Sequence, residues 1–204
     1  MKRFYSIIIF VLLASASLFS QKFGGGMFAG PVVSQVDGDS QGGYNKLGVH
    51  FGGFVDRAFN DNFGWQMEIK YIQKGSRKVP DLENGDIEDF KIGLHYIEVP
   101  CLGTYYLNEN ITIELGIAAG YLFKANIEDQ GYQVPDAIDD FHIVEISGLA
   151  GAYYNFNEKL SVGARGSYSL LPIRPHPGGQ TYWLNMGQYN NLLSAALYFH
   201  IGKR

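Results

Sequence analysis

The segment ITIELGIAAGYLF, residues 111–123, gives the clearest indication of how this chain folds. Apolar side chains recur at every second position, and small or polar residues, including Glu114, stand between them. A period of two is that of a β-strand, whose side chains point alternately to the two faces of a sheet. A helix of this length would be too short to cross a membrane and would place Glu114 in lipid. We therefore interpret the stretch as a strand.

The same alternation recurs along most of the chain and predicts eight strands. They span Gly26–Val33, Lys46–Phe59, Phe63–Lys74, Phe90–Leu107, Ile111–Phe123, Phe141–Phe156, Leu160–Leu171 and Tyr189–Ile201. Pro100 interrupts the fourth strand, and because proline cannot donate to a strand ladder, we expect a bulge or bend there.

The connections between these strands are alternately very short and long. The short ones are Asn60–Asn62, Asn108–Asn110 and Asn157–Lys159, and the long ones are Ser34–Asn45, Gly75–Asp89, Ala125–Asp140 and Arg174–Gln188. Tight turns at one end and long loops at the other are typical of barrels that cross a membrane. The sequence therefore predicts an all-β fold, an eight-stranded antiparallel up-and-down transmembrane β-barrel.

A soluble, lipocalin-like ligand carrier would show the same alternation with its apolar side turned inward. The aromatic residues favour the membrane barrel, because they stand near both ends of the apolar face, as in the girdles of such barrels. They are Trp65, Tyr105, Tyr154 and Phe156 toward the short turns, and Tyr71, Tyr121, Phe123 and Tyr168 toward the long loops. The soluble carrier stays as an alternative.

If the apolar face meets lipid, the charged residues of the strands point inward. They are Glu68, Lys70, Glu98, Glu114, Glu145 and Arg165. The lumen of an eight-stranded barrel is just wide enough for side chains to fill. We expect a hydrogen-bonded structural plug with Arg165 as its hub, since a guanidinium can serve two carboxylates at once.

The N-terminus has the order of a secretory signal peptide. Lys2 and Arg3 precede the apolar run Ile7–Leu13, and small residues follow. We expect cleavage before Gln21, with a cut after Ala16 as the alternative, so residues 1–20 would be the signal peptide and residues 21–204 one barrel domain. Without Lys2 and Arg3, and with no acid in residues 1–20, the formal net charge changes from −4 to −6. This balance makes nucleic acid an unsuitable partner.

Several short motifs together resemble the PorT-like outer-membrane β-barrel family. They are Tyr96–Pro100 followed by Tyr105 and Tyr106, the strand Gly116–Tyr121, and the arginine-bearing strand Val162–Leu170. The resemblance implies an integral outer-membrane protein of a Gram-negative cell and, for PorT itself, a link to type IX secretion. The chain departs from the pattern at Val144–Gly148 and in its ending, Gly202–Arg204.

The sequence does not indicate a catalytic site or a metal site. The five histidines are scattered without a pair at metal-ligand spacing, so we expect no metal, no cofactor and no catalytic residue. A lipid-modifying enzyme is the alternative, with His142, Glu145 and Ser147 as its best candidates, but alternation puts His142 on the opposite face.

The segment from Arg174 to Trp183 is the most distinctive long loop. Prolines stiffen it, and it carries Arg174, His176, Tyr182 and Trp183, of types that are frequent in protein contacts. We therefore expect membrane lipid around the barrel and a possible protein partner at these loops or at the periplasmic rim. The expected role is structural or binding, and a role as an accessory of a secretion assembly is its narrower form.

Overall fold

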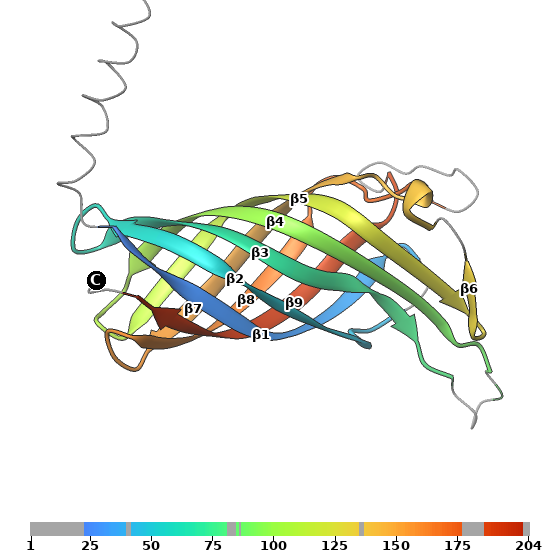
Figure 1. Ribbon diagram of the computed structural model, residues 1–204, viewed down its shortest axis with the longest axis horizontal. Coiled ribbons are helices and arrows are strands. Elements are labelled where there is room, and N and C mark those ends of the chain that lie inside the picture. Colours follow the sequence, from blue (N-terminus) through green and yellow to red (C-terminus); the bar gives the residue numbers. More distant parts are fainter. Residues whose placement is uncertain are drawn as a thin grey trace, which may run out of the picture.

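The computed structural model describes residues 23–39, 42–80, 85, 87–134, 137–176 and 186–201. Their strands are β1 (Gly24–Asp37), β2 (Lys46–Ala58), β3 (Phe63–Lys78), β4 (Phe90–Tyr106), β5 (Ile111–Asp129), β6 (Tyr132–Val134), β7 (Val144–Asn155), β8 (Leu160–Ser169) and β9 (Tyr189–His200), with a 3₁₀ turn, η2, at Ala137–Asp140. Neighbouring strands pair antiparallel in the order β4-β3-β2-β1-β9-β8-β7-β5-β6, and β4 also pairs with β5. That last pairing closes eight strands into a barrel and leaves β6 as a short appendage (Figure 1). The predicted eight-stranded barrel is confirmed.

The faces of the strands are arranged as the alternation predicts. On β5, Ile113, Leu115 and Ile117 are exposed on the outside, whereas Glu114 and Ala118 are buried inside. Eight outward-facing aromatic residues ring the two ends of this apolar surface. They are Trp65, Tyr71, Tyr105, Tyr121, Phe123, Tyr154, Phe156 and Tyr168. No helix in the described part of the chain is long and apolar enough to cross a membrane.

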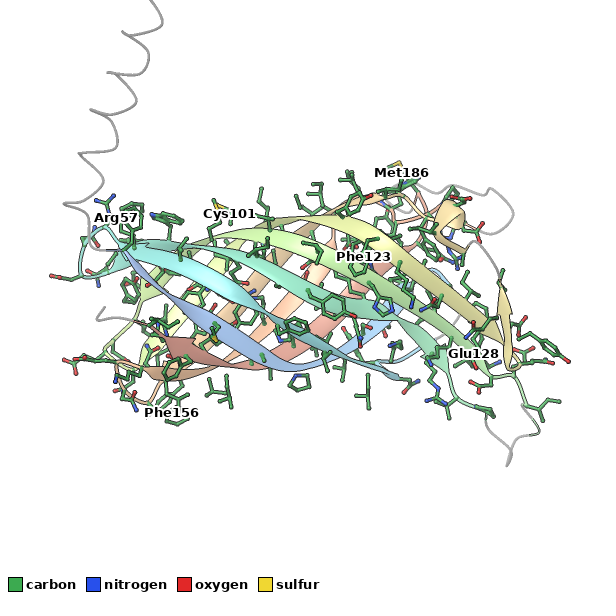
Figure 2. The ribbon with its side chains drawn as sticks, viewed as in Figure 1. Arg57, Cys101, Phe123, Glu128, Phe156 and Met186 are labelled. Carbon is green, nitrogen blue, oxygen red and sulfur yellow. The ribbon has the colours of Figure 1, made fainter. Side chains whose placement is uncertain are left out.

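Three turns of the same design close one end of the barrel, which we call the tight-turn end. In each turn the side-chain oxygen of an asparagine, Asn60, Asn108 or Asn157, accepts hydrogen bonds from the backbone N–H groups two and three residues later, at 2.8–2.9 Å. A short polar side chain that bonds the backbone in this way stabilises a tight turn without a tertiary partner. The opposite end is called the long-loop end, and Figure 2 shows Arg57 and Phe156 at the tight-turn end and Glu128 at the long-loop end.

The strands continue beyond their predicted ends at the long-loop end. β3 runs to Lys78 and β5 to Asp129, into segments that the sequence analysis assigns to loops. At this end of the barrel the polarity of the two faces reverses. Ile127 in the extension of β5 and Ile92 of the neighbouring β4 point inward, whereas Lys124 and Lys91 on the same two strands point outward. Because strands were predicted from an apolar outward face, these extensions, whose outward face is polar, were not predicted as strands. The wall therefore extends beyond its apolar outer band.

Of the bulge or bend expected at Pro100, the bulge is not found. The ladder between β3 and β4 omits Val99 and Pro100 but continues in the same register on both sides, and Pro100 pairs with Ala118 of β5. Proline removes only one donor, so a single gap is sufficient. The register shift of β4 lies between His95 and Tyr96 instead, opposite the segment of β5 that contains Phe123. There the extra residue turns both Phe123 and Lys124 outward and brings Ile127 inside.

Candidate functional site

A first charged cluster in the lumen is centred on Arg165 of β8. Its Nη1 and Nη2 donate to both carboxylate oxygens of Glu68 at 2.9 and 2.7 Å, and its Nε and Nη2 donate to both oxygens of Glu114 at 2.5 and 2.9 Å. Nη2 also donates to Tyr153 Oη at 2.8 Å, and the Tyr153 hydroxyl donates to Glu114. Each carboxylate thus forms a bidentate ion pair with the same guanidinium, and bidentate pairs are strong and geometrically specific. The cluster ties β3, β5, β7 and β8 together across the lumen.

A second cluster lies nearer the long-loop end. Lys70 Nζ is 3.1 Å from Glu98 Oε2, and Lys74 Nζ is 2.5 Å from Glu98 Oε1 and 2.9 Å from Glu145 Oε1. Asn190 of β9 donates to the other oxygen of Glu145 at 3.0 Å. All four charged side chains are at most 2 % exposed, so each charge needs the partners that the others provide.

Two apolar groups enclose these clusters within the lumen. Toward the long-loop end, Ile72, Leu94, Tyr96 and Leu122 belong to a packed core that also includes Phe141 of the rim. Toward the tight-turn end, four aromatic side chains and Ala196 pack together. These aromatic residues are Phe28, Phe54, Tyr153 and Tyr198, and the Tyr153 and Tyr198 ring centroids lie 4.7 Å apart. The lumen is therefore filled with side chains and does not form an aqueous channel.

All six lumen residues selected from the sequence are buried, but they lie in two clusters and not in one network. Arg165 contacts Glu68 and Glu114, whereas Lys70, Glu98 and Glu145 assemble around Lys74, which the sequence analysis omitted. Tyr153 and Asn190 were also missed. The alternation could have found Tyr153, because it stands on the inward face shared with Glu145. The positions of these side chains along the barrel axis depend on strand tilt, so their contacts could not be inferred from single strands.

The predicted partner loop is described only at its beginning. The Arg174 guanidinium carbon lies 4.7 Å from the centre of the Phe141 ring, and Arg174 Nε donates to Gln188 Oε1. Arg174 also forms an isolated antiparallel bridge with Gln188. Its side chain is thus engaged within the rim. His176 lies beside Gly38, and Tyr182 and Trp183 fall outside the described residues.

The residues considered for catalysis are not brought together. Glu145 and Ser147 are buried in the lumen, whereas His142 is exposed at the rim, where its Nδ1 lies 2.9 Å from the Pro172 carbonyl oxygen. Among the described residues, no group of three or more His, Cys, Asp or Glu side chains could hold a metal ion. Cys101, the sole cysteine of the chain, faces outward on β4.

An apolar outer band, aromatic residues at its two ends and a filled lumen define a small membrane-spanning β-barrel. Residues 19–174 match the model of the family described as outer membrane protein beta-barrel domain, and the chain belongs to that family. The protein is therefore a small integral outer-membrane β-barrel. In such barrels the long loops lie outside the cell and the tight turns face the periplasm.

Solved structures share this fold at low sequence identity. The attachment invasion locus protein Ail of Yersinia pestis aligns with a TM-score of 0.52 and 15 % identity, over 88 % of this chain and 99 % of Ail. The Neisserial surface protein A, NspA, aligns with a TM-score of 0.52 and 16 % identity, over 87 % of this chain and 96 % of NspA. A comparison with curated proteins finds no match.

Proposed function

We propose that this protein is a binding component of the outer membrane that works through its long-loop end and not through its lumen. The filled lumen carries this proposal, because two buried ionic clusters and two apolar groups occupy the space that a transported solute would need. The charged lumen residues act in this proposal as a structural core that keeps the wall rigid.

The rim provides a surface suited to a protein partner. Beyond the outward aromatic residues, the hairpin of β5 and β6 exposes Tyr132 at 81 % and Val134 at 43 %. Ile87, in the connection between β3 and β4, is 71 % exposed, and this connection meets the hairpin where the Gln130 N–H donates to the Asp89 carbonyl oxygen at 2.9 Å. β6 lies at the extreme of the long-loop end in Figure 1. Apolar side chains exposed to water in this way are typical of interaction sites. We define Ile87, Tyr132 and Val134 as the rim patch, and it supplements the Arg174 loop considered from the sequence.

A photo-crosslinking amino acid tests this role directly. Placed at Tyr132 in intact cells, it is expected to form a discrete adduct with a protein, while the same amino acid at Glu109, in a tight turn, should not form that adduct. Val134→Ser should weaken the adduct formed from position 132. Adducts from Glu109 alone, or none from either position, would contradict a partner at the rim.

The resemblance to the PorT-like family supports a narrower form of the proposal, in which the partner belongs to a type IX secretion assembly. The supporting motifs are Tyr96–Pro100, Gly116–Tyr121 and Val162–Leu170. A strain without this protein should then retain secreted cargo in its periplasm, and the wild-type chain should restore export. Normal cargo export by the deletion strain would end the secretion role and leave the barrel itself unaffected.

We further infer that residues 1–20, which lie outside the described residues, direct export and are removed. N-terminal sequencing of protein purified from outer membranes is expected to begin at Gln21. A start at Ser17 would indicate the alternative cut, and an intact Met1 would contradict removal.

A further inference from the structure

A groove of about 340 Å³ lies on the outside of the barrel at the long-loop end. Lys46, Lys91 and Lys124 line it together with the amide residues Gln73, Asn126 and Gln133 and one acid, Glu128, so it spans β2 to β6. Gly93 contributes to the hollow because it has no side chain; a Cβ built there would find its nearest neighbour, the Asn126 carbonyl oxygen, at 3.9 Å. The groove is thus lined by basic and amide groups that can donate to an anion.

The groove begins directly above the aromatic band. Tyr71 Oη lies 2.6 Å from His95 Nδ1, a groove residue, and accepts a hydrogen bond from Gln73 Nε2 at 2.9 Å. The Tyr71 ring packs beside Phe51 and Phe123, with centroids 5.1 and 6.1 Å away. Aromatic residues in such bands sit at the level of the lipid headgroups. The groove therefore lies where headgroups of the outer leaflet meet the wall.

Positive charge in the groove is only partly neutralised. Lys91 Nζ is 3.7 Å from Glu128 Oε2, a loose and solvent-exposed pair. Within the described residues, neither Lys46 nor Lys124 forms an ion pair, and Lys46 Nζ donates only to the Leu47 carbonyl oxygen at 2.9 Å. Three ammonium groups face one carboxylate, so the groove favours an anion.

Apart from Arg165, the Lys and Arg residues of the described strands lie on β2, β3, β4 and β5. On the opposite wall, which consists of β7, β8, β9 and β1, Arg165 is the sole Lys or Arg in the strands as described, and it points into the lumen. A general attraction to the membrane surface would not require such an asymmetry. The distribution indicates a localised site.

We propose that this groove binds the phosphate groups of an anionic glycolipid of the outer leaflet. Lys46, Lys91 and Lys124 are placed to contact the phosphates, and Gln73 and Asn126 are placed to donate hydrogen bonds to phosphate or sugar oxygens. The acyl chains of that lipid then lie on the apolar wall below, beside Tyr121 and Phe123. The groove adjoins the rim patch, since Gln133 lines the groove and lies between Tyr132 and Val134, but binding of the lipid requires no protein partner.

Binding to a phosphorylated lipid tests the proposal. The full chain in phosphatidylcholine nanodiscs is titrated with diphosphorylated lipid A and, separately, with the same lipid after its phosphates are removed. The wild-type protein is expected to prefer the phosphorylated form. A lysine near an anionic surface strengthens binding by roughly fivefold, so Lys46→Gln/Lys124→Gln should weaken it by about 25-fold and abolish the preference.

Arg57→Gln/Lys159→Gln provides the matched control, since it removes the same charge at the tight-turn end and should bind as the wild type does. Folding of each variant is checked by its mobility on an unboiled gel. If the double variant does not fold, Lys124→Gln alone, at an exposed position, should still weaken binding about fivefold. Unchanged affinity in the groove variant, or an equal loss in the control, would overturn the site.

Discussion

Arg165 is the residue on which the filled lumen depends most. Four of its hydrogen bonds go to two buried carboxylates, so its removal leaves the negative charges of Glu68 and Glu114 without their main partner. Breaking a buried ion pair on one side typically costs about 3–5 kcal/mol. We expect Arg165→Met to lower the temperature at which the folded band of an unboiled gel converts to the unfolded one.

A compensated variant separates charge from packing. Arg165→Met combined with Glu68→Gln and Glu114→Gln removes both carboxylates with the guanidinium, and it should recover most of the lost stability. An unchanged transition in Arg165→Met, or a triple variant less stable than the single one, would contradict the proposed role of this cluster.

For individual residues, the sequence predicts which side chains face the lumen better than it predicts which of these side chains contact one another. Arg165, Glu68 and Glu114 could be identified because strand alternation assigns every residue to one face. The separation of Lys70, Glu98 and Glu145 into a second cluster could not be, since it depends on the stagger between strands that lie far apart in the chain.

Each tight turn is stabilised by side-chain hydrogen bonds formed within the turn itself. In the turn between β4 and β5, Asn108 Oδ1 accepts from the N–H groups of Asn110 and Ile111 at 2.9 and 2.8 Å. Asn108→Ala removes both bonds and should destabilise the barrel by about 1 kcal/mol, since exposed bonds contribute modestly. Urea unfolding in detergent micelles measures this change.

Asn108→Asp is the control for that turn, because a carboxylate oxygen can accept the same two bonds. It should unfold close to the wild-type midpoint. If both substitutions shift the midpoint equally, the side-chain oxygen of Asn108 does not stabilise the turn.

For whole strands, the ends at the long-loop side could not be predicted from the sequence. β3 and β5 were expected to end near Lys74 and Phe123, where the apolar outer face ends, yet both continue as wall above the membrane. The physical reason is a change of surroundings: above the lipid, water lies outside and the packed core of Ile92 and Ile127 lies inside. Of the groove lysines, Lys124 lies in the extension of β5, so its neighbourhood with Lys46 and Lys91 was not recognised.

For the whole molecule, a membrane-spanning barrel requires that the surroundings of its outer face change from lipid to water along the barrel axis. Ile117, in the middle of the apolar band, is 58 % exposed, and Ile113 is 44 % exposed closer to the tight turns. An outward arginine at the bilayer midplane costs roughly 2–4 kcal/mol, compared with about 0–1 near the interface.

We therefore expect Ile117→Arg to destabilise the protein in lipid vesicles far more than Ile113→Arg does. Folding equilibria in urea for the two variants provide the comparison. Equal, small effects at both positions would indicate that this face is not buried in hydrocarbon.

Whether the apolar outer face meets lipid can be measured directly at Cys101, the one cysteine in the sequence. It faces outward on β4 and pairs in register with Met67 and Ile117 on its two neighbours. A nitroxide spin label attached to Cys101 in lipid bilayers should collide often with dissolved oxygen and rarely with a water-soluble nickel chelate. Frequent collisions with the nickel chelate and few with oxygen would show that water surrounds this face, and would contradict a barrel that turns its apolar side to lipid.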